Sequence, residues 1–160
     1  MKLSESALSR LTYQHLTITE IVEAVPDARL HFNPAPGKWS INDNIAHLAR
    51  YNVIFRERLK KIQEQDAQQY PRYNAEADPE FPLWKQKSTA ELLQSISMER
   101  EIITREAQSY SEAALNRIGV HPKFGRLTVI DWIEFYLLHE AHHIFTIYKL
   151  KNDVPIVAGN

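Results

Sequence analysis

The sequence predicts an all-α protein that folds as a four-helix bundle. Apolar residues recur at helical spacing in four long segments, and no strand-like alternation of useful length is present. Three of the four segments open on a hydroxyl side chain with an acidic residue three positions on, a pattern typical of helix starts. One long polar stretch separates the middle segments, so we expect an up-and-down type bundle with one long connection. At 160 residues, the chain is most simply one domain, 1–160.

The first two helices are separated by a loop rich in turn-forming residues. Helical spacing of apolar residues over 4–25 predicts the first helix, which Pro26 ends. The prolines and glycine of the stretch 27–38 indicate a loop. Ser40 is a good N-cap, and Asp43 stands three residues on, where its carboxylate can accept from the backbone N–H of Ser40. The second helix is expected to run to about residue 62.

Residues 63–87 form the long connection, which is polar, contains three prolines and shows no period. Such a segment either covers a functional site or simply crosses between distant ends of the bundle. Ser88 and Glu91 then form a capping-box pattern before a third helix that reaches about residue 110. The charge-rich part of this helix, 98–106, is expected to face solvent. A loop over 111–126 follows.

The last helix is expected over 128–150, with Thr128 as its cap, and 151–160 as a short tail. This segment carries apolar residues on nearly all sides, which predicts burial all round. Because one side of a bundle helix normally meets water, the excess suggests a homodimer.

Composition narrows the functional classes. The net charge of −1, with Lys and Arg spread along the chain, disfavours nucleic acid as a partner. The chain has no cysteine, which excludes thiolate ligands and a cysteine nucleophile. We find no signal-peptide core and no run of about 18 apolar residues, so no membrane span is expected and a cytoplasmic location is the default.

Histidines in the last helix point to a metal ion. His139 and His143 lie roughly 40° apart around a helix axis and about 6 Å apart along it. Two imidazoles are thus side by side on one face, as two ligands of one metal ion require. The same stripe includes Trp132 and Tyr136, so the pair is expected to face inward. These aromatics, like Tyr51, are candidates for pocket walls or for plain core packing.

The segment His139–His143 also matches H-E-x-x-H, the zincin protease signature. A zincin needs a third ligand downstream, but no histidine or glutamate follows His143. The extended form would need glycine and histidine where this chain has Thr146 and Lys149. The motif therefore does not predict a zincin, and no protein group is assigned as the catalytic base.

A third ligand must then come from upstream, where His15, His31, His47 and His121 are the candidates, besides carboxylates. His47 is the best placed, because it lies on a predicted helix at the edge of its apolar stripe.

Two longer motifs resemble a known family. The stretches Pro36–Leu48 (PGKWSINDNIAHL) and His121–His143 (HPKFGRLTVIDWIEFYLLHEAHH) resemble the two signature stretches of the DinB/YfiT-like superfamily. This resemblance implies a four-helix bundle that binds a divalent metal through three histidines, one in the second helix and two in the last. Carried over to this sequence, the ligands are His47, His139 and His143.

The resemblance implies a small-molecule substrate and leaves three functions open. The first is a metal-dependent hydrolase acting through metal-bound water. The second is an S-transferase that uses a low-molecular-weight thiol of the bacillithiol or mycothiol type. The third is a non-catalytic metal-binding dimer. Zinc and nickel are the favoured ions, with manganese and iron as alternatives.

Residues around the expected ligands have open roles. Asp43 or Asn44 could bond the second nitrogen of a ligand imidazole, although Asp43 could instead complete the Ser40 cap. His142 is expected to support a ligand or lie at an interface. Thr146 replaces a glutamine or arginine that many relatives carry, which implies a different pocket polarity.

Overall fold

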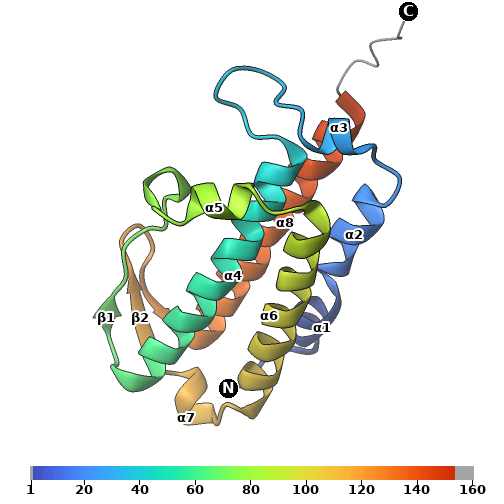
Figure 1. Ribbon diagram of the computed structural model, residues 1–160. Coiled ribbons are helices and arrows are strands. Elements are labelled where there is room, and N and C mark those ends of the chain that lie inside the picture. Colours follow the sequence, from blue (N-terminus) through green and yellow to red (C-terminus); the bar gives the residue numbers. More distant parts are fainter. Residues whose placement is uncertain (1, 154–160) are drawn as a thin grey trace, which may run out of the picture.

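The computed structural model describes residues 2–153, which fold as a bundle of helices with a small sheet at one end (Figure 1). Long bundle helices are α4 (Ile41–Glu64), α6 (Thr89–Ser109) and α8 (Val129–Asp153), and the pair α1 (Glu5–Tyr13) and α2 (Leu16–Val22) supplies the remaining side. The shorter elements are α3 (Asp27–Leu30), β1 (Gln68–Gln69), η1 (Ala75–Ala77), α5 (Phe81–Lys85), α7 (Glu112–Leu115), β2 (Ile118–His121) and β3 (Gly125–Thr128). The predicted four-helix bundle is confirmed.

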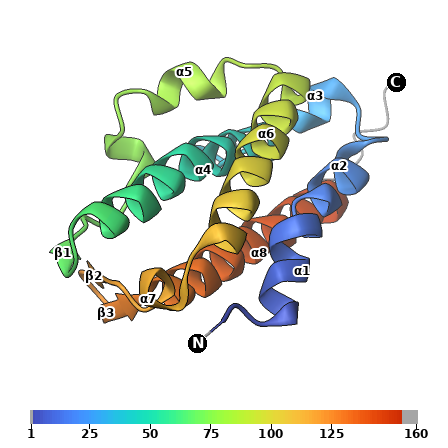
Figure 2. The same ribbon diagram turned by 90° about the horizontal axis from the view of Figure 1, so that it is seen from below.

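The long connection sets the direction of the helices. In Figure 1, both α4 and α6 run from the top of the view to the bottom, and α8 runs back upward. The segment between α4 and α6 therefore returns along the whole bundle and carries β1, η1 and α5. Helix α4 packs against both α6 and α8, and α1 and α2 pack against α6 and α8, as Figure 2 shows from below.

Three helix starts were predicted from their caps, and all three are confirmed. The Ser40 hydroxyl accepts from the Asp43 backbone N–H at 3.0 Å, and the Asp43 carboxylate accepts from the Ser40 N–H at 3.0 Å. Equivalent reciprocal pairs begin α6, between Ser88 and Glu91, and α8, between Thr128 and Asp131. Each pair satisfies backbone donors that a helix start leaves without partners.

The predicted single helix over 4–25 is wrong, because the chain breaks between α1 and α2. At the break, two side chains of α6 donate to the carbonyl oxygen of Leu11: the guanidinium of Arg100, at 3.3 Å, and the hydroxyl of Thr104, at 3.2 Å. This carbonyl therefore has partners outside a continuous helix, whereas the carbonyl of Arg10 keeps its helical bond to the Gln14 N–H. Arg100 is only 1% exposed, so the expectation that 98–106 is entirely a solvated face is also wrong.

The loop expected over 111–126 is wrong in part, because α7, β2 and the start of β3 lie in it. In the described part of the chain, β2 pairs antiparallel with β3 and parallel with β1. These strands have two to four residues each, too few to show an alternation in the sequence. Gly119 of β2 allows a close approach: a Cβ there would lie 2.6 Å from Trp132 Nε1 and 2.7 Å from Ile62 Cδ1. The sheet is thereby fixed against α4 and α8.

The three aromatic residues considered as pocket walls or core divide between the two. Trp132 and Tyr136 are fully buried, and the Tyr136 hydroxyl donates to Asn52 Oδ1 at 2.7 Å. They belong to the core beneath the site, whereas Tyr51 lines the cavity described below. Within residues 2–153, no helix combines the length and the apolar character that crossing a membrane requires.

Candidate metal centre

Packing of α4 against α8 brings three histidines together. His47 comes from α4, and His139 and His143 come from successive turns of α8. Each offers a ring nitrogen, and these nitrogens all lie within 4.8 Å of one another. The shortest approach is 3.1 Å, between Nε2 of His47 and Nε2 of His139. The three residues singled out from the sequence are thus adjacent in the fold.

These distances and this chemistry are compatible with a shared divalent ion. Two imidazole ligands of a tetrahedral zinc ion, each about 2.0–2.1 Å from the metal, lie roughly 3.3 Å apart. Burial is the main reason why the pKa values of the three rings fall, to about 2 for His47, about 4 for His139 and about 3 for His143. All three rings are therefore neutral near pH 7, the state in which an imidazole binds a metal ion.

Asn44 orients His143. Its Oδ1 lies 2.9 Å from Nδ1 of His143, and its own Nδ2 donates to the carbonyl of Ser40 at 2.8 Å. An amide oxygen can only accept, so the His143 ring carries its hydrogen on Nδ1 and leaves the Nε2 lone pair available. Of Asp43 and Asn44, the two candidates for bonding the second nitrogen of a ligand imidazole, Asn44 forms this bond.

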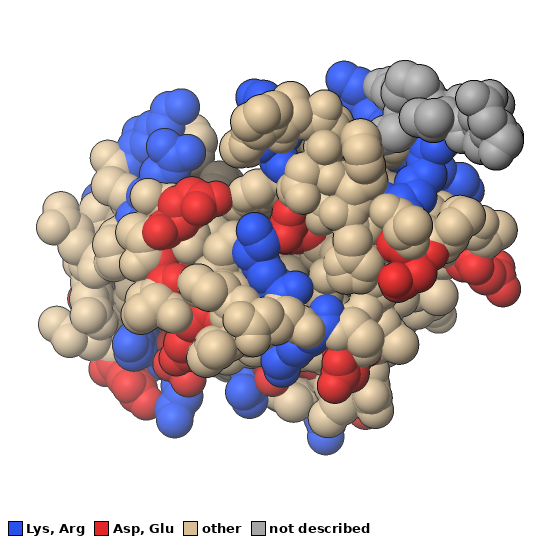
Figure 3. Space-filling view, turned by 45° about the horizontal axis from the view of Figure 1, so that its top comes forward, with Lys and Arg blue, Asp and Glu red and all other residues tan. Residues whose placement is uncertain are grey.

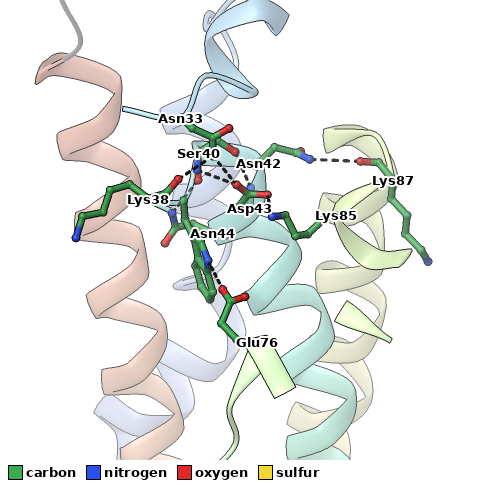
Figure 4. Close-up of polar contacts among 10 residues, drawn as sticks. Asn33, Lys38, Ser40, Asn42, Asp43, Asn44, Glu76, Lys85 and Lys87 are labelled. Carbon is green, nitrogen blue, oxygen red and sulfur yellow. Dashed lines mark hydrogen bonds and ion pairs between the residues drawn. The ribbon is translucent and has the colours of Figure 1, made fainter. Parts of the chain in front are cut away.

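Asp43 instead belongs to the start of α4, as Figure 4 shows. Besides closing the Ser40 cap, its carboxylate accepts from Asn33 Nδ2 at 3.1 Å and pairs with Lys85 Nζ at 3.1 Å. These donors hold the pKa of Asp43 below its usual range, against the opposing effect of burial. The network ties the loop before α4 and helix α5 to the turn that presents Asn44 and His47.

His47 is oriented by aromatic packing. Its ring centroid lies 5.1 Å from that of Trp39, 5.5 Å from that of Tyr73 and 6.1 Å from that of Tyr51. Within residues 2–153, Nδ1 of His47 and Nδ1 of His139 have no hydrogen-bond partner although both atoms are buried. Among the three rings, only His143 therefore has a polar group that fixes its second nitrogen.

The three rings open into a cavity of about 430 Å³. The long connection supplies part of its wall, namely Arg72, Tyr73, Asn74 and Ala75. The end of β2 supplies His121, and the turn that follows supplies Lys123 and Phe124. The connection therefore does what both interpretations expected: it crosses between distant ends of the bundle, and it lines the cavity of the candidate site. Its sequence has no motif that would have identified Tyr73 or Arg72 beforehand.

Other histidines lie outside the trio. His15 is buried at the junction of α1 and α2, and His31 is exposed and pairs with Asp27 at 3.6 Å. His121 and the exposed His142 line the same cavity but do not join the cluster of converging nitrogens. Thr146 was expected on the metal-facing stripe, but its hydroxyl donates back to the carbonyl of His142, and it does not line the cavity.

Glu140, the acidic residue of the H-E-x-x-H match, points away from the cavity. It is 1% exposed and forms a buried ion pair with Arg100, and Gln14 Nε2 donates to its other oxygen at 2.9 Å. Its neighbours are therefore α1 and α6. This placement agrees with the prediction that the H-E-x-x-H match does not make this protein a zincin.

The buried histidines make the metal-free protein sensitive to acid. Burial, helped by the charge of Arg100, lowers the pKa of His15 from 6.5 to about 4. Between these values the unfolded chain binds more protons than the folded one, so the stability present above pH 6.5 is lost as the pH falls toward 4. The three clustered histidines act in the same direction. Urea unfolding at pH 7 and pH 5 measures this loss, which a His15→Gln variant should reduce. Equal stability at both pH values would contradict it.

Fold and site together define a helical-bundle protein with a candidate three-histidine metal centre. The sequence matches the family model of the DinB superfamily over residues 11–147, and the chain belongs to this superfamily. A curated relative, the uncharacterized protein YuaE of Bacillus subtilis (strain 168), is 25% identical over 145 residues, which cover 83% of this chain and 90% of YuaE.

Two solved structures share the fold. YfiT from Bacillus subtilis, described as a probable metal-dependent hydrolase with an unusual four-helix bundle topology, aligns with a TM-score of 0.83 at 19% identity. That alignment covers 95% of this chain and 90% of YfiT. The four-helix bundle protein TT2238 aligns with a TM-score of 0.66 at 19% identity, over 89% of this chain and 96% of TT2238.

Proposed function

We propose that this protein is a divalent-metal-dependent hydrolase of a small molecule, with His47, His139 and His143 as the metal ligands. The observation that carries the proposal is the convergence of three neutral imidazoles, from two helices, at the wall of one cavity. The description of YfiT as a probable metal-dependent hydrolase supports the choice of reaction class. Zinc and nickel are the preferred ions, with manganese and iron as alternatives, because imidazole is a suitable ligand for this range of metals.

The chain's own residues would hold the ion and position the substrate. When bound, a divalent ion on three imidazoles supplies Lewis-acid chemistry, which polarises a substrate oxygen and makes water acidic enough to attack near neutral pH. Asn44 keeps the Nε2 atom of His143 available, and Trp39, Tyr51 and Tyr73 hold the His47 ring in place. No described residue that lines the cavity is an aspartate or glutamate, so no carboxylate base is assigned.

Turnover assays separate this function from the two others considered. Metal-free protein is reloaded with each ion and offered ester and amide substrates without thiol, and then an electrophile with a low-molecular-weight thiol. Metal-dependent hydrolysis without thiol supports the hydrolase, and loss of this activity in His139→Ala ties it to the site. Metal-dependent consumption of thiol alone would replace the proposal by an S-transferase. Tight metal binding with neither activity would favour a non-catalytic metal-binding protein.

Asn44 offers a test of how the ligands are held. We expect Asn44→Leu to weaken metal affinity by about 10- to 100-fold, because His143 would lose the acceptor that fixes its ring. Asn44→Asp keeps an acceptor oxygen at this position and should retain most of the affinity. Competition with a chelator of known affinity measures both variants. Affinity unchanged in Asn44→Leu would show that the hydrogen bond does not support the site.

We also propose that the chain forms a homodimer through α8. Leu138, Phe145 and Tyr148 on this helix are 64%, 61% and 54% exposed, which is unusual for neighbouring large apolar side chains. Sedimentation equilibrium is expected to give twice the chain mass, and Phe145→Glu is expected to give the monomer. A wild-type monomer at micromolar concentration would contradict this.

A further inference from the structure

The cavity next to the three histidines is lined by basic side chains and lacks acidic ones. Its described lining includes Arg58, Arg72 and Lys123 and no aspartate or glutamate, although the whole chain carries a net charge of −1. By contrast, the neighbouring cavity on α4, which Arg58 also borders, mixes Arg50 and Lys61 with two glutamates. Acidic and basic side chains are likewise interspersed over the face shown in Figure 3. The charge of this one cavity is therefore a local feature.

Arg58 is the buried member of the basic set. It is 6% exposed and has no ion-pair partner among residues 2–153. Its Nη2 donates to the carbonyl of Pro71 at 3.1 Å, and its guanidinium carbon lies 4.9 Å from the centre of the Trp132 ring. Buried arginines are rarely left without an anion. Arg58 also acts electrostatically on Tyr51, whose ring centroid lies 4.5 Å from that of His139.

His121 places a hydrogen-bond donor in the same region. Its Nδ1 accepts from the backbone N–H groups of Lys123, at 3.1 Å, and Phe124, at 3.2 Å. The neutral ring therefore carries its hydrogen on Nε2, which has no hydrogen-bond partner in the described part of the chain. The ring is 5% exposed and lies 5.5 Å from Trp132, the ring that Arg58 also contacts. Arg58 and His121 are thus neighbours: the guanidinium has no carboxylate partner among residues 2–153, and the imidazole has a free N–H donor.

We infer that the molecule bound in this cavity is anionic, with a carboxylate or phosphate group held by Arg58 and His121 and attracted by Arg72 and Lys123 at the rim. Phe135 connects this anion subsite to the three histidines, since its ring lies 5.2 Å from His121 and 6.5 Å from His139. The other end of a small molecule can therefore reach the candidate metal ligands. The statement about the substrate rests on the proposed function, whereas anion binding by the cavity does not.

Calorimetric titration of the metal-free, full-length protein with inorganic phosphate and with succinate tests the anion subsite. We expect saturable binding of at least one anion, weakened by added salt because part of the site is exposed. Arg58→Met is expected to raise the Kd about tenfold, since a bond to a charged group is lost. The double variant Arg72→Ala/Lys123→Ala leaves the core intact and is expected to raise the Kd roughly three- to tenfold. Lys61→Ala, an exposed lysine of α4 outside this cavity, is the matched control and should leave the Kd unchanged.

The outcomes separate this inference from the proposed function. Binding of phosphate alone or succinate alone supports the anion subsite and names its preferred group. Absence of binding by both anions, or binding that neither the double variant nor Arg58→Met weakens, overturns it. Should Arg58→Met fail to fold, the Kd of the double variant Arg72→Ala/Lys123→Ala tests the anion subsite by itself. Metal content is measured on a second portion of each protein after reloading with zinc or nickel: metal retention without anion binding refutes only the anion subsite, and anion binding without metal retention refutes only the metal centre.

Discussion

Replacing Glu140 by alanine is expected to lower the free energy of unfolding by about 3–5 kcal/mol, the cost of leaving a buried charge without its partner. The variant leaves the Arg100 guanidinium 1% exposed and without its carboxylate. It also removes one of the two acceptors of Gln14 Nε2 at the junction of α1 and α2, the other being the carbonyl of Leu137. Equilibrium unfolding in urea measures the change.

Glu134→Ala is the matched control on the same helix. Glu134 pairs with Arg10 at 2.7 Å, but both side chains are about one third exposed, so its loss should cost less than about 1 kcal/mol. A double variant, Arg100→Met/Glu140→Leu, should recover much of the stability, because it removes both buried charges. Equal, small losses for Glu140→Ala and Glu134→Ala would contradict the account of the buried pair.

A further variant, Glu140→Gln, decides whether Glu140 has a catalytic role. Because its carboxylate faces α1 and α6, we expect folded Glu140→Gln protein to bind metal as the wild type does. A stable Glu140→Gln variant with normal metal content and no activity would instead indicate that Glu140 takes part in catalysis, as the H-E-x-x-H match suggests.

Metal binding is expected to have the second large effect on the stability of the folded protein. An ion at about 100 times its Kd stabilises the folded protein by about 2.7 kcal/mol, provided that it does not bind the unfolded chain. For a domain of this size the midpoint of thermal unfolding then rises by roughly 5–10 °C. His47→Ala should abolish this gain, because the remaining two imidazoles lie on α8 alone. His142→Ala, next to a ligand but outside the cluster, should keep it. A gain of the same size in both variants would show that the ion binds elsewhere.

Local chemistry explains which parts of the fold the sequence predicts. The starts of α4, α6 and α8 depend on residues three positions apart, and these pairs are visible without any knowledge of tertiary structure. The adjacency of His139 and His143 likewise follows from helix geometry alone. His47 joins them across the bundle, and its selection depended on the resemblance to a family as well as on its apolar stripe.

The features that the sequence did not predict depend on contacts between distant segments. The break between α1 and α2 is tied to Arg100, which the chain reaches about ninety residues later. Arg100 itself sits in a charge-rich segment, and nothing local distinguishes it from the exposed residues beside it. Tyr73 and His121 enter the cavity because the long connection and a short hairpin fold over α4 and α8, and neither segment has a periodic pattern.

The most direct test of the metal centre is elemental analysis of purified protein after reloading with zinc or nickel and removal of excess ion. Wild type and His142→Ala are expected to retain about one ion per chain, and His47→Ala, His139→Ala and His143→Ala to retain almost none. Equal metal content in all five proteins would contradict the assignment of these three histidines as ligands, and with it the proposed hydrolase.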